Sequence, residues 1–252
     1  MLCDGCNKDF NEKDLIEYNP KTFLCQDCLT FIQYHIHSNS YRPNNFGLTK
    51  DRNGLYIGVT FCIGTDKFSN FYNLLKTYSK DYYFYFKNYP YAINICSYPL
   101  NIQNELFKDV FERLYFHLHK NHIIDIEDMP MHIHLDKEYF KQNEIAKIDY
   151  IVNNYYDVIA RYSDWHYHYD NPYCKIVSKS SDKWGCNSEN KNVACNINNN
   201  TVELRFFNTA FDYKTFRKRI DVALKIIELA KRFSWISITS FTTCQLNDWF
   251  TN

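Results

Sequence analysis

Residues 201–233 constrain the fold of this chain more than any other stretch, because their hydrophobic period changes partway along. The first part alternates apolar and polar side chains, as expected for a strand with one buried face. Glu203 and Arg205 share the polar face, so an acid and a base lie side by side there. The apolar positions are Val202, Leu204 and Phe206. The pattern alone fits either a surface strand with two solvated charges or a strand that carries a functional site.

The second part of this stretch has the period of an amphipathic helix, and Asp212 is a suitable N-cap for it. The apolar stripe contains Phe216, Ile220, Leu224 and Ile227. Basic residues lie mostly off that stripe, and four of them come early in the helix: Lys214, Arg217, Lys218 and Arg219. These four are candidate contacts for RNA phosphates or another anion.

Two Cys-x2-Cys pairs near the N-terminus predict a metal site. Cys3 and Cys6 are separated from Cys25 and Cys28 by 18 residues, within the range typical of four-cysteine zinc sites. Each pair is expected to sit on a tight turn that points two thiolates at one tetrahedral ion, with Gly5 easing the first turn. We therefore expect a small zinc ribbon or knuckle with structural zinc and no catalytic role.

Length and composition predict one main globular domain with this small appendage. We assign a zinc-binding module to residues 1–37, a polar linker to 38–54 and the main domain to 55–252. The chain has 29 basic and 29 acidic residues, which argues against extended non-specific DNA binding. No apolar run reaches the roughly 18–20 residues of a membrane helix, and no signal-peptide core is present, so we expect a cytoplasmic protein with no membrane contact.

The remaining pattern predicts alternating strands and helices. Strands are expected at 55–63, 81–87, 91–97, 131–136 and 193–198, the last pairing with 201–207 through Asn199 and Asn200. Helices are expected at 67–79, 101–120 and 138–160, with a short closing helix at 240–252. Residues 170–192 are predicted to form a mobile loop.

Three of these segments resemble a known family. The sequence E-x-R-F-F-x-T at 203–209, MHIHLD at 131–136 and YAINICSYP at 91–99 are similar to motifs of the amidoligase family of ATP-dependent carboxylate-amine ligases. The resemblance spans about residues 55–233. It implies an α+β fold with a mainly antiparallel, glutamine-synthetase-like sheet flanked by helices. It also implies that His132 and His134, followed by Asp136, line a site for metal and nucleotide phosphates.

The chain departs from the family pattern at three acidic positions. Thr60, Cys62 and Asn94 stand where the family carries glutamates of its metal-nucleotide site. Magnesium-ATP chemistry needs hard oxygen ligands, and Glu203 with Arg205 and two histidines supplies only one carboxylate. The expectation is a pseudoenzyme that retains the ligase scaffold and acts by binding.

Two other interpretations of this pocket remain open. In the first, the chain is an active ATP-dependent ligase that joins a carboxylate to an amine, with Asp136, Asp66 or Glu203 as substitute magnesium ligands. In the second, Cys62, His132, His134 and Glu203 hold a soft transition metal. The other His-x-His pairs, 35/37, 117/119 and 166/168, are expected to be surface or packed aromatic residues.

The expected partner is a host protein or an RNA. Relatives of the amidoligase family occur on phages and plasmids, and the abundance of Tyr, Phe, Asn and Lys indicates an AT-rich genome. These observations favour a mobile-element inhibitor of a host system, such as antiphage (CRISPR-type) defence, in a bacterial cell. Tyrosine side chains could stack on RNA bases.

Overall fold

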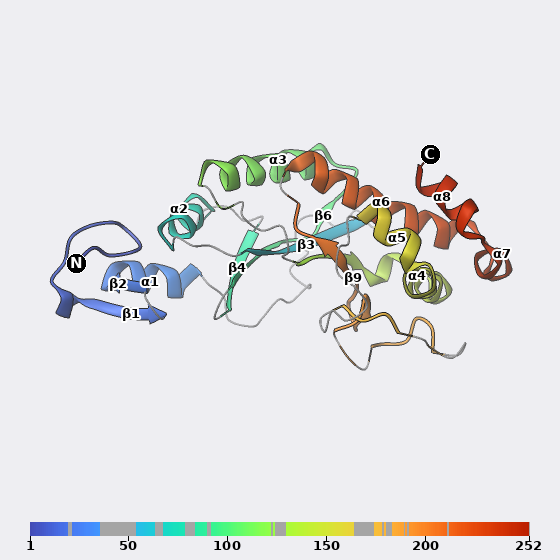
Figure 1. The fold of residues 1–252 in the computed structure, drawn as a ribbon, viewed down its shortest axis with the longest axis horizontal. Coiled ribbons are helices and arrows are strands. Elements are labelled where there is room, and N and C mark those ends of the chain that lie inside the picture. The colour runs from blue at the N-terminus through green and yellow to red at the C-terminus, as the bar shows by residue number, and fades with distance from the viewer. Residues whose placement is uncertain are drawn as a thin grey trace.

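The computed structural model describes residues 1–19, 22–35, 54–63, 68–78, 84–89, 92–121, 123, 130–163, 174–177, 179, 183–188, 190, 192–210 and 212–251. Almost all of the predicted linker 38–54, together with His37, Asp66, His166 and His168, lies outside the described residues. Within the described part, helices flank a multistranded antiparallel sheet, so the predicted α+β class is confirmed (Figure 1).

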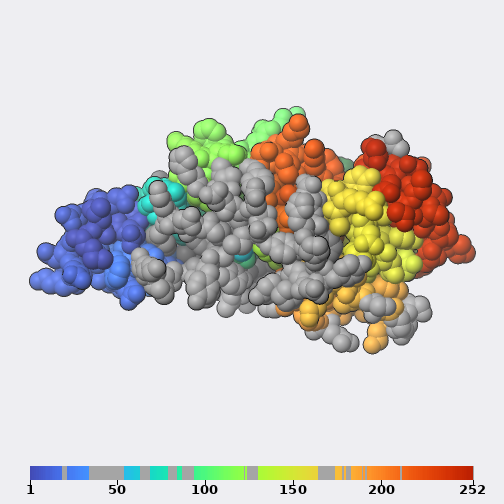
Figure 2. All heavy atoms as spheres, viewed as in Figure 1, coloured from blue at the N-terminus to red at the C-terminus, as the bar shows by residue number. Residues whose placement is uncertain are grey.

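Residues 1–35 form a small unit at one end of the molecule (Figures 1 and 2). A short 3-10 turn at Glu12–Asp14 leads into the antiparallel hairpin of β1 (Leu15–Asn19) and β2 (Thr22–Cys25). Helix α1 (Gln26–His35) follows β2 directly. The predicted module boundary at residue 37 lies outside the described residues.

The main sheet has the strand order β4-β5-β3-β7-β9-β8, with β6 paired to the start of β3. Its strands are β3 (Tyr56–Ile63), β4 (Phe84–Tyr89), β5 (Ala92–Ser97), β6 (Leu100–Asn101), β7 (Pro130–Asp136), β8 (Cys195–Ile197) and β9 (Thr201–Asn208). All of these pairings are antiparallel. Because β3, β7 and β9 are neighbours, segments far apart in the sequence lie side by side at the centre of the sheet.

One face of this sheet packs against helices α3 (Glu105–Lys120) and α6 (Tyr213–Arg232) (Figure 1). The ring of Phe61 on β3 lies 6.1 Å from that of Phe111 on α3 and 5.7 Å from that of Phe216 on α6. The Asp212 carboxylate accepts a hydrogen bond from the Thr215 N–H at 2.7 Å, so the predicted N-cap of α6 is confirmed. The opposite face of β3 carries the alternating polar positions of the predicted site.

Helix α2 (Phe68–Tyr78) follows the prediction closely, with Phe71, Leu75 and Tyr78 buried. The predicted helix at 138–160 is wrong in one respect, because it is divided into a 3-10 turn at Lys137–Tyr139, α4 (Gln142–Asn154) and α5 (Tyr156–Ser163). The break falls after two asparagines, which are poor helix formers. There the Tyr155 hydroxyl donates a hydrogen bond to the Ile238 carbonyl, which lies in the C-terminal segment of the chain.

The C-terminal segment forms α7 (Trp235–Ser240) and α8 (Thr243–Thr251). The closing helix was predicted, and Leu246 is buried in it as expected. Trp249 is partly buried and packs on Phe233 with a ring-centre distance of 5.5 Å. Helix α7 was not predicted as a separate element; Ser234 caps it by accepting a hydrogen bond from the Ser237 N–H.

The segment predicted as a mobile loop at 170–192 is anchored where it is described. Asp149, fully buried on α4, accepts a hydrogen bond from the Gly185 N–H at 3.0 Å and forms an ion pair with Lys179. Asn153, one turn later, accepts from the Val177 N–H at 2.9 Å. In the described part of the chain, no helix combines the length and apolar character needed to cross a membrane.

Candidate functional site

The four cysteines of the two Cys-x2-Cys pairs come together in the N-terminal unit. The Sγ atoms of Cys3, Cys6, Cys25 and Cys28 all lie within 4.8 Å of one another. A tetrahedral zinc ion with Zn–S bonds of about 2.3 Å places its sulfurs about 3.8 Å apart, so the cluster is close to a metal-binding geometry. The predicted pairing of these residues in one metal-binding group is therefore confirmed.

Different local structures position the two pairs. Cys3 and Cys6 flank a tight turn, in which the Asn7 N–H donates to the Cys3 carbonyl at 2.8 Å. Cys25 ends β2 and Cys28 lies in the first turn of α1, so the second pair occupies a strand-to-helix junction and not a second hairpin turn. The four cysteines are thus carried by one turn, the end of one hairpin and the start of one helix.

Gly5 is required for a reason other than the predicted one. A β-carbon at this position would lie 2.9 Å from the Cys28 Sγ, closer than real contacts allow. The residue with a left-handed backbone in this turn is Asn7, with φ of 58°. Gly5 therefore permits the close approach of the two cysteine pairs.

The thiol pKa values fit a site that needs a cation. Burial raises the pKa of Cys3, but hydrogen bonds from backbone groups, led by the Cys25 N–H, lower it to about 7 overall. Burial raises the pKa of Cys25 and of Cys28. Buried thiols of this kind ionise when a metal ion coordinates them. Four thiolates around one ion match the closed, four-sulfur coordination of structural zinc.

The second group of predicted residues meets on the polar face of the main sheet. In register, Thr60 on β3 pairs with His132 on β7, and His134 pairs with Glu203 on β9. Arg205 follows two residues after Glu203 and shares its face. The sheet thus brings together five of the predicted pocket residues, as the resemblance implied.

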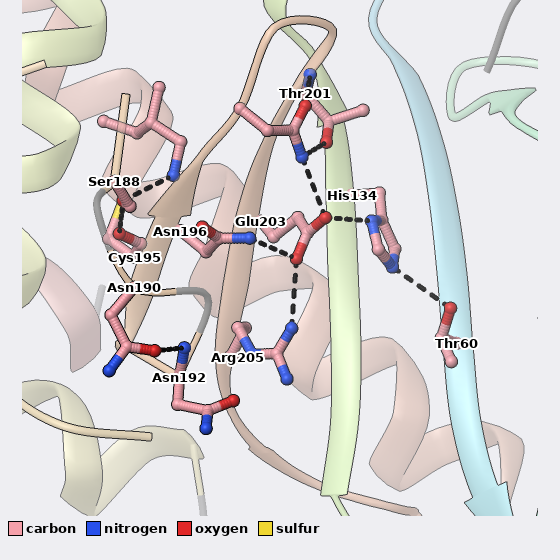
Figure 3. A network of polar contacts seen from close by, with 12 residues as sticks. Thr60, His134, Ser188, Asn190, Asn192, Cys195, Asn196, Thr201, Glu203 and Arg205 are labelled. Atoms are coloured by element: carbon pink, nitrogen blue, oxygen red, sulfur yellow. Dashed lines mark hydrogen bonds and ion pairs between the residues drawn. The ribbon is translucent and has the colours of Figure 1, made fainter. Parts of the chain in front are cut away.

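Glu203 is the centre of a hydrogen-bonded network on this face (Figure 3). Its Oε2 atom accepts from Asn196 Nδ2 at 2.8 Å and from Arg205 at 3.1 Å. Its Oε1 atom accepts from Asn198 Nδ2 at 2.9 Å and lies 3.5 Å from His134 Nδ1. On the far side of the ring, His134 Nε2 lies 3.1 Å from the Thr60 hydroxyl. Both carboxylate oxygens are therefore already occupied by protein donors.

The electrostatics of this face favour an ionised Glu203 and a neutral His132. Burial raises the pKa of Glu203, but His134, Asn196 and Arg205 outweigh it and hold the pKa far below its usual range. Burial, reinforced by the positive charge of Arg205, lowers the pKa of His132 well below its ordinary value. The resulting charges of Glu203 and Arg205 cancel within the protein.

The other pocket residues lie at the margin of this network. Burial raises the pKa of the Cys62 thiol to about 11, so it stays protonated at neutral pH. Asn94 pairs in register with Cys62, and its Oδ1 atom is buried without a hydrogen-bond partner among the described residues. Asp136 accepts a hydrogen bond from the Glu138 N–H at 3.0 Å and caps the following 3-10 turn.

Neither alternative metal set is assembled in the described residues. Of the proposed magnesium ligands, Asp66 is outside that part, Asp136 caps a turn and Glu203 is held by four side chains. The soft-metal set of Cys62, His132, His134 and Glu203 does not form a group of convergent ligand atoms, whereas the four N-terminal cysteines do.

The predicted basic contacts on α6 are only partly available to a partner. Lys214 and Lys218 are exposed, and Arg217 forms an ion pair with Asp221 at 3.0 Å. Arg219 is 3% exposed and donates a hydrogen bond to the Asn208 carbonyl, so its prediction as an anion contact was wrong. Arg219 lies three residues after Phe216 and next to Ile220, so it borders the apolar stripe of α6 and is buried with it. Its guanidinium group binds the end of β9.

The sequence did not lead us to Asn196 and Asn198, whose side chains donate hydrogen bonds to Glu203. A signal was present, because the predicted turn at Asn199–Asn200 places Asn196 directly opposite Glu203. Asn198 was hidden by its second role in the turn, where its Oδ1 atom accepts from the Asn200 and Thr201 N–H groups.

Comparisons with family models, with curated proteins and with solved structures found no match to this chain.

Proposed function

We propose that this chain is a zinc-stabilised binding protein that keeps a ligase-like sheet but does not carry out ATP-dependent ligation. The observation that carries this proposal is that both carboxylate oxygens of Glu203 already contact side chains of the protein. A magnesium ligand needs free oxygen lone pairs, and those of Glu203 face Asn196, Asn198, Arg205 and His134.

The neutral residues around this carboxylate support the same proposal. Thr60, a protonated Cys62 and Asn94 offer no charge to offset a second metal ion or a triphosphate. Binding of Mg-ATP would have to break the Glu203–Arg205 ion pair in a half-buried environment. Removing one partner of such a pair leaves a charge without compensation, which costs several kcal/mol.

The proposed metal is zinc, held by Cys3, Cys6, Cys25 and Cys28. Zinc prefers tetrahedral sulfur coordination, and a set of four protein thiolates leaves no open position for a substrate. Its role is then to stabilise residues 1–35, which have only one hairpin and one helix and a correspondingly small core.

The proposed partner is a host protein, and the proposed role is that of a mobile-element inhibitor of a host defence system. The arrangement of α6 supports a protein partner over an RNA. Arg219 is buried and Arg217 is paired with Asp221, so among the described residues only Lys214 and Lys218 of the predicted phosphate-binding set have no ion pair. Phosphate contacts supply most of the affinity in RNA binding of this kind.

Calorimetric titration of the purified chain with Mg-ATP tests the absence of ligase chemistry. We expect no saturable heat, and no ADP in the presence of amine and carboxylate substrates. Saturable, magnesium-dependent heat that disappears in Glu203→Gln would overturn the proposal.

Capture of partners from host cells tests the second part. The tagged chain should retain the same host protein before and after ribonuclease treatment. Loss of the captured material with ribonuclease, together with a fall in the 260/280 nm absorbance ratio, would identify RNA as the partner instead.

A further inference from the structure

The N-terminal unit contacts the main domain through helix α2. Phe31 of α1 packs against Tyr72 of α2 in an edge-to-face arrangement, with 5.4 Å between ring centres. Tyr72 is 5% exposed, so this contact is buried. Helices α1 and α2 therefore meet directly beside the cysteine cluster.

Tyr72 also reaches the cysteine cluster itself. Tyr72 and Cys28 line the same cavity, and the Tyr72 hydroxyl group interacts with the Cys28 side chain, which lowers the pKa of the thiol against the effect of burial. Cys28 lies at the start of α1, whereas Tyr72 belongs to the main domain. A phenylalanine would serve equally well for packing against Phe31, so the ring contact does not require the hydroxyl group.

A cavity of about 360 Å³ lies between the cysteine turn and α2. Cys6 and Cys28 line it from one side, and Tyr72 and Lys76 from the other. The Lys76 ammonium lies 5.4 Å from the centre of the Tyr72 ring. A zinc ion with four thiolates carries a net charge of about −2, which such a hydroxyl donor and ammonium group stabilise.

We infer that α2 supplies the outer shell of the metal centre through Tyr72 and Lys76, so that metal binding holds the N-terminal unit against the main domain. Tyr72 is a positioning residue in this arrangement, since it binds a metal ligand and not the metal. Metal affinity and docking are then linked: a group that stabilises the metal-bound thiolate in the docked state favours docking when metal is bound. This inference rests on the proposed zinc site.

The rate of zinc release to a chromogenic chelator tests this inference in the full chain. Tyr72→Phe removes only the hydroxyl group and should speed release or weaken affinity by about tenfold, the lower range for outer-shell changes at metal sites. Tyr78→Phe is the matched control, because Tyr78 is a buried tyrosine of the same helix that is not part of the cysteine site. Equal release rates in the two variants would overturn the inference.

Hydrogen exchange supplies an independent readout of docking. Removal of zinc should reduce the protection of amides in α2 of the wild-type chain, and Tyr72→Phe should reduce this metal-dependent difference. Protection in α6 should not change, which shows that the main domain stays folded. Metal-independent exchange in α2 would contradict the inference, whereas a chain that binds no zinc would refute the metal site as well.

Discussion

The cysteine cluster and the polar face of the sheet both bring together residues that the sequence pattern predicts to be functional. The two regions differ in what these residues bind. In the cluster, four sulfurs converge within 4.8 Å, and burial raises the pKa of two of the thiols. On the sheet, the Glu203 oxygens accept hydrogen bonds from amide and guanidinium donors of the protein itself, and His134 Nδ1 lies 3.5 Å away.

This difference teaches that convergence of residues is not enough to define a binding site. The cysteine cluster leaves its ligand atoms directed at a common centre, so a cation completes it. On the sheet, the Glu203–Arg205 ion pair already gives each of the two charges a partner, although the buried Arg205 Nε has no hydrogen-bond partner among the described residues. Four substitutions test this difference between the two regions, and they follow in order of decreasing expected effect.

Cys25→Ser should have the largest effect, because it removes one ligand from the proposed zinc site. Binding of structural zinc in small domains contributes about 10–16 kcal/mol, so we expect loss of bound zinc and rapid hydrogen exchange throughout β1 and β2. Metal analysis and amide exchange measure both. Cys244→Ser, an exposed cysteine on α8, should retain one zinc per chain. Full zinc content in Cys25→Ser would show that Cys25 is not a zinc ligand and would contradict the proposed four-cysteine site.

Glu203→Gln should destabilise the main domain by about 3 kcal/mol, since it leaves Arg205 without its buried counter-charge. Urea unfolding followed by tryptophan fluorescence measures this effect, because all four tryptophans lie after residue 160. Glu112→Gln removes a carboxylate from an exposed pair with Lys108 and should change stability by less than about 0.5 kcal/mol. A Glu203→Gln variant as stable as the wild type would show that the network is not structural.

His132 should make the main domain sensitive to acid. Its folded-state pKa is well below 6.5, so the unfolded chain takes up a proton below about pH 6.5 and the folded chain does not. The free energy of unfolding should therefore fall with decreasing pH, by at most about 1.4 kcal/mol per pH unit from this residue. His132→Gln should give a flatter dependence between pH 6.5 and 5 in the same urea experiment. The same pH dependence of the free energy of unfolding in both proteins would show that His132 is not the source of the acid sensitivity.

Thr60→Val should have the smallest effect, about 1 kcal/mol, because it removes the hydroxyl group beside His134 Nε2 and keeps the side-chain shape. Thr77→Val is the control, as its hydroxyl bonds to the exposed helix backbone at the Asn73 carbonyl. Thermal unfolding of both variants measures the difference. Equal melting temperatures would mean that the Thr60 hydroxyl adds nothing to the sheet network.

The sequence allowed most of the central sheet to be predicted, because its strands alternate clearly. The change of period after Phe206 and the Asp212 cap placed β9 and α6 within a few residues. The break at Tyr155 could not be predicted, because it depends on a hydrogen bond to Ile238, which is 83 residues away. Helical periodicity continues on both sides of that position and hides the interruption.

The metal site was predicted more completely than the sheet network, because its residues are specified by local spacing in the sequence. Cysteine spacing specifies a metal cluster locally, so its four ligands were found from sequence. The state of Glu203 depends on which donors reach it from β7 and β8, and Asn198 was not evident from its turn-forming role. The contact of Tyr72 with Cys28 joins elements on either side of the polar linker and had no sequence signal.

Native mass spectrometry of the full chain, purified without chelator and then mixed with Mg-ATP, tests both sites in one measurement. We expect a mass equal to the chain plus one zinc ion, unchanged by nucleotide. A metal-free chain, or a stable adduct with ATP and magnesium, would contradict it.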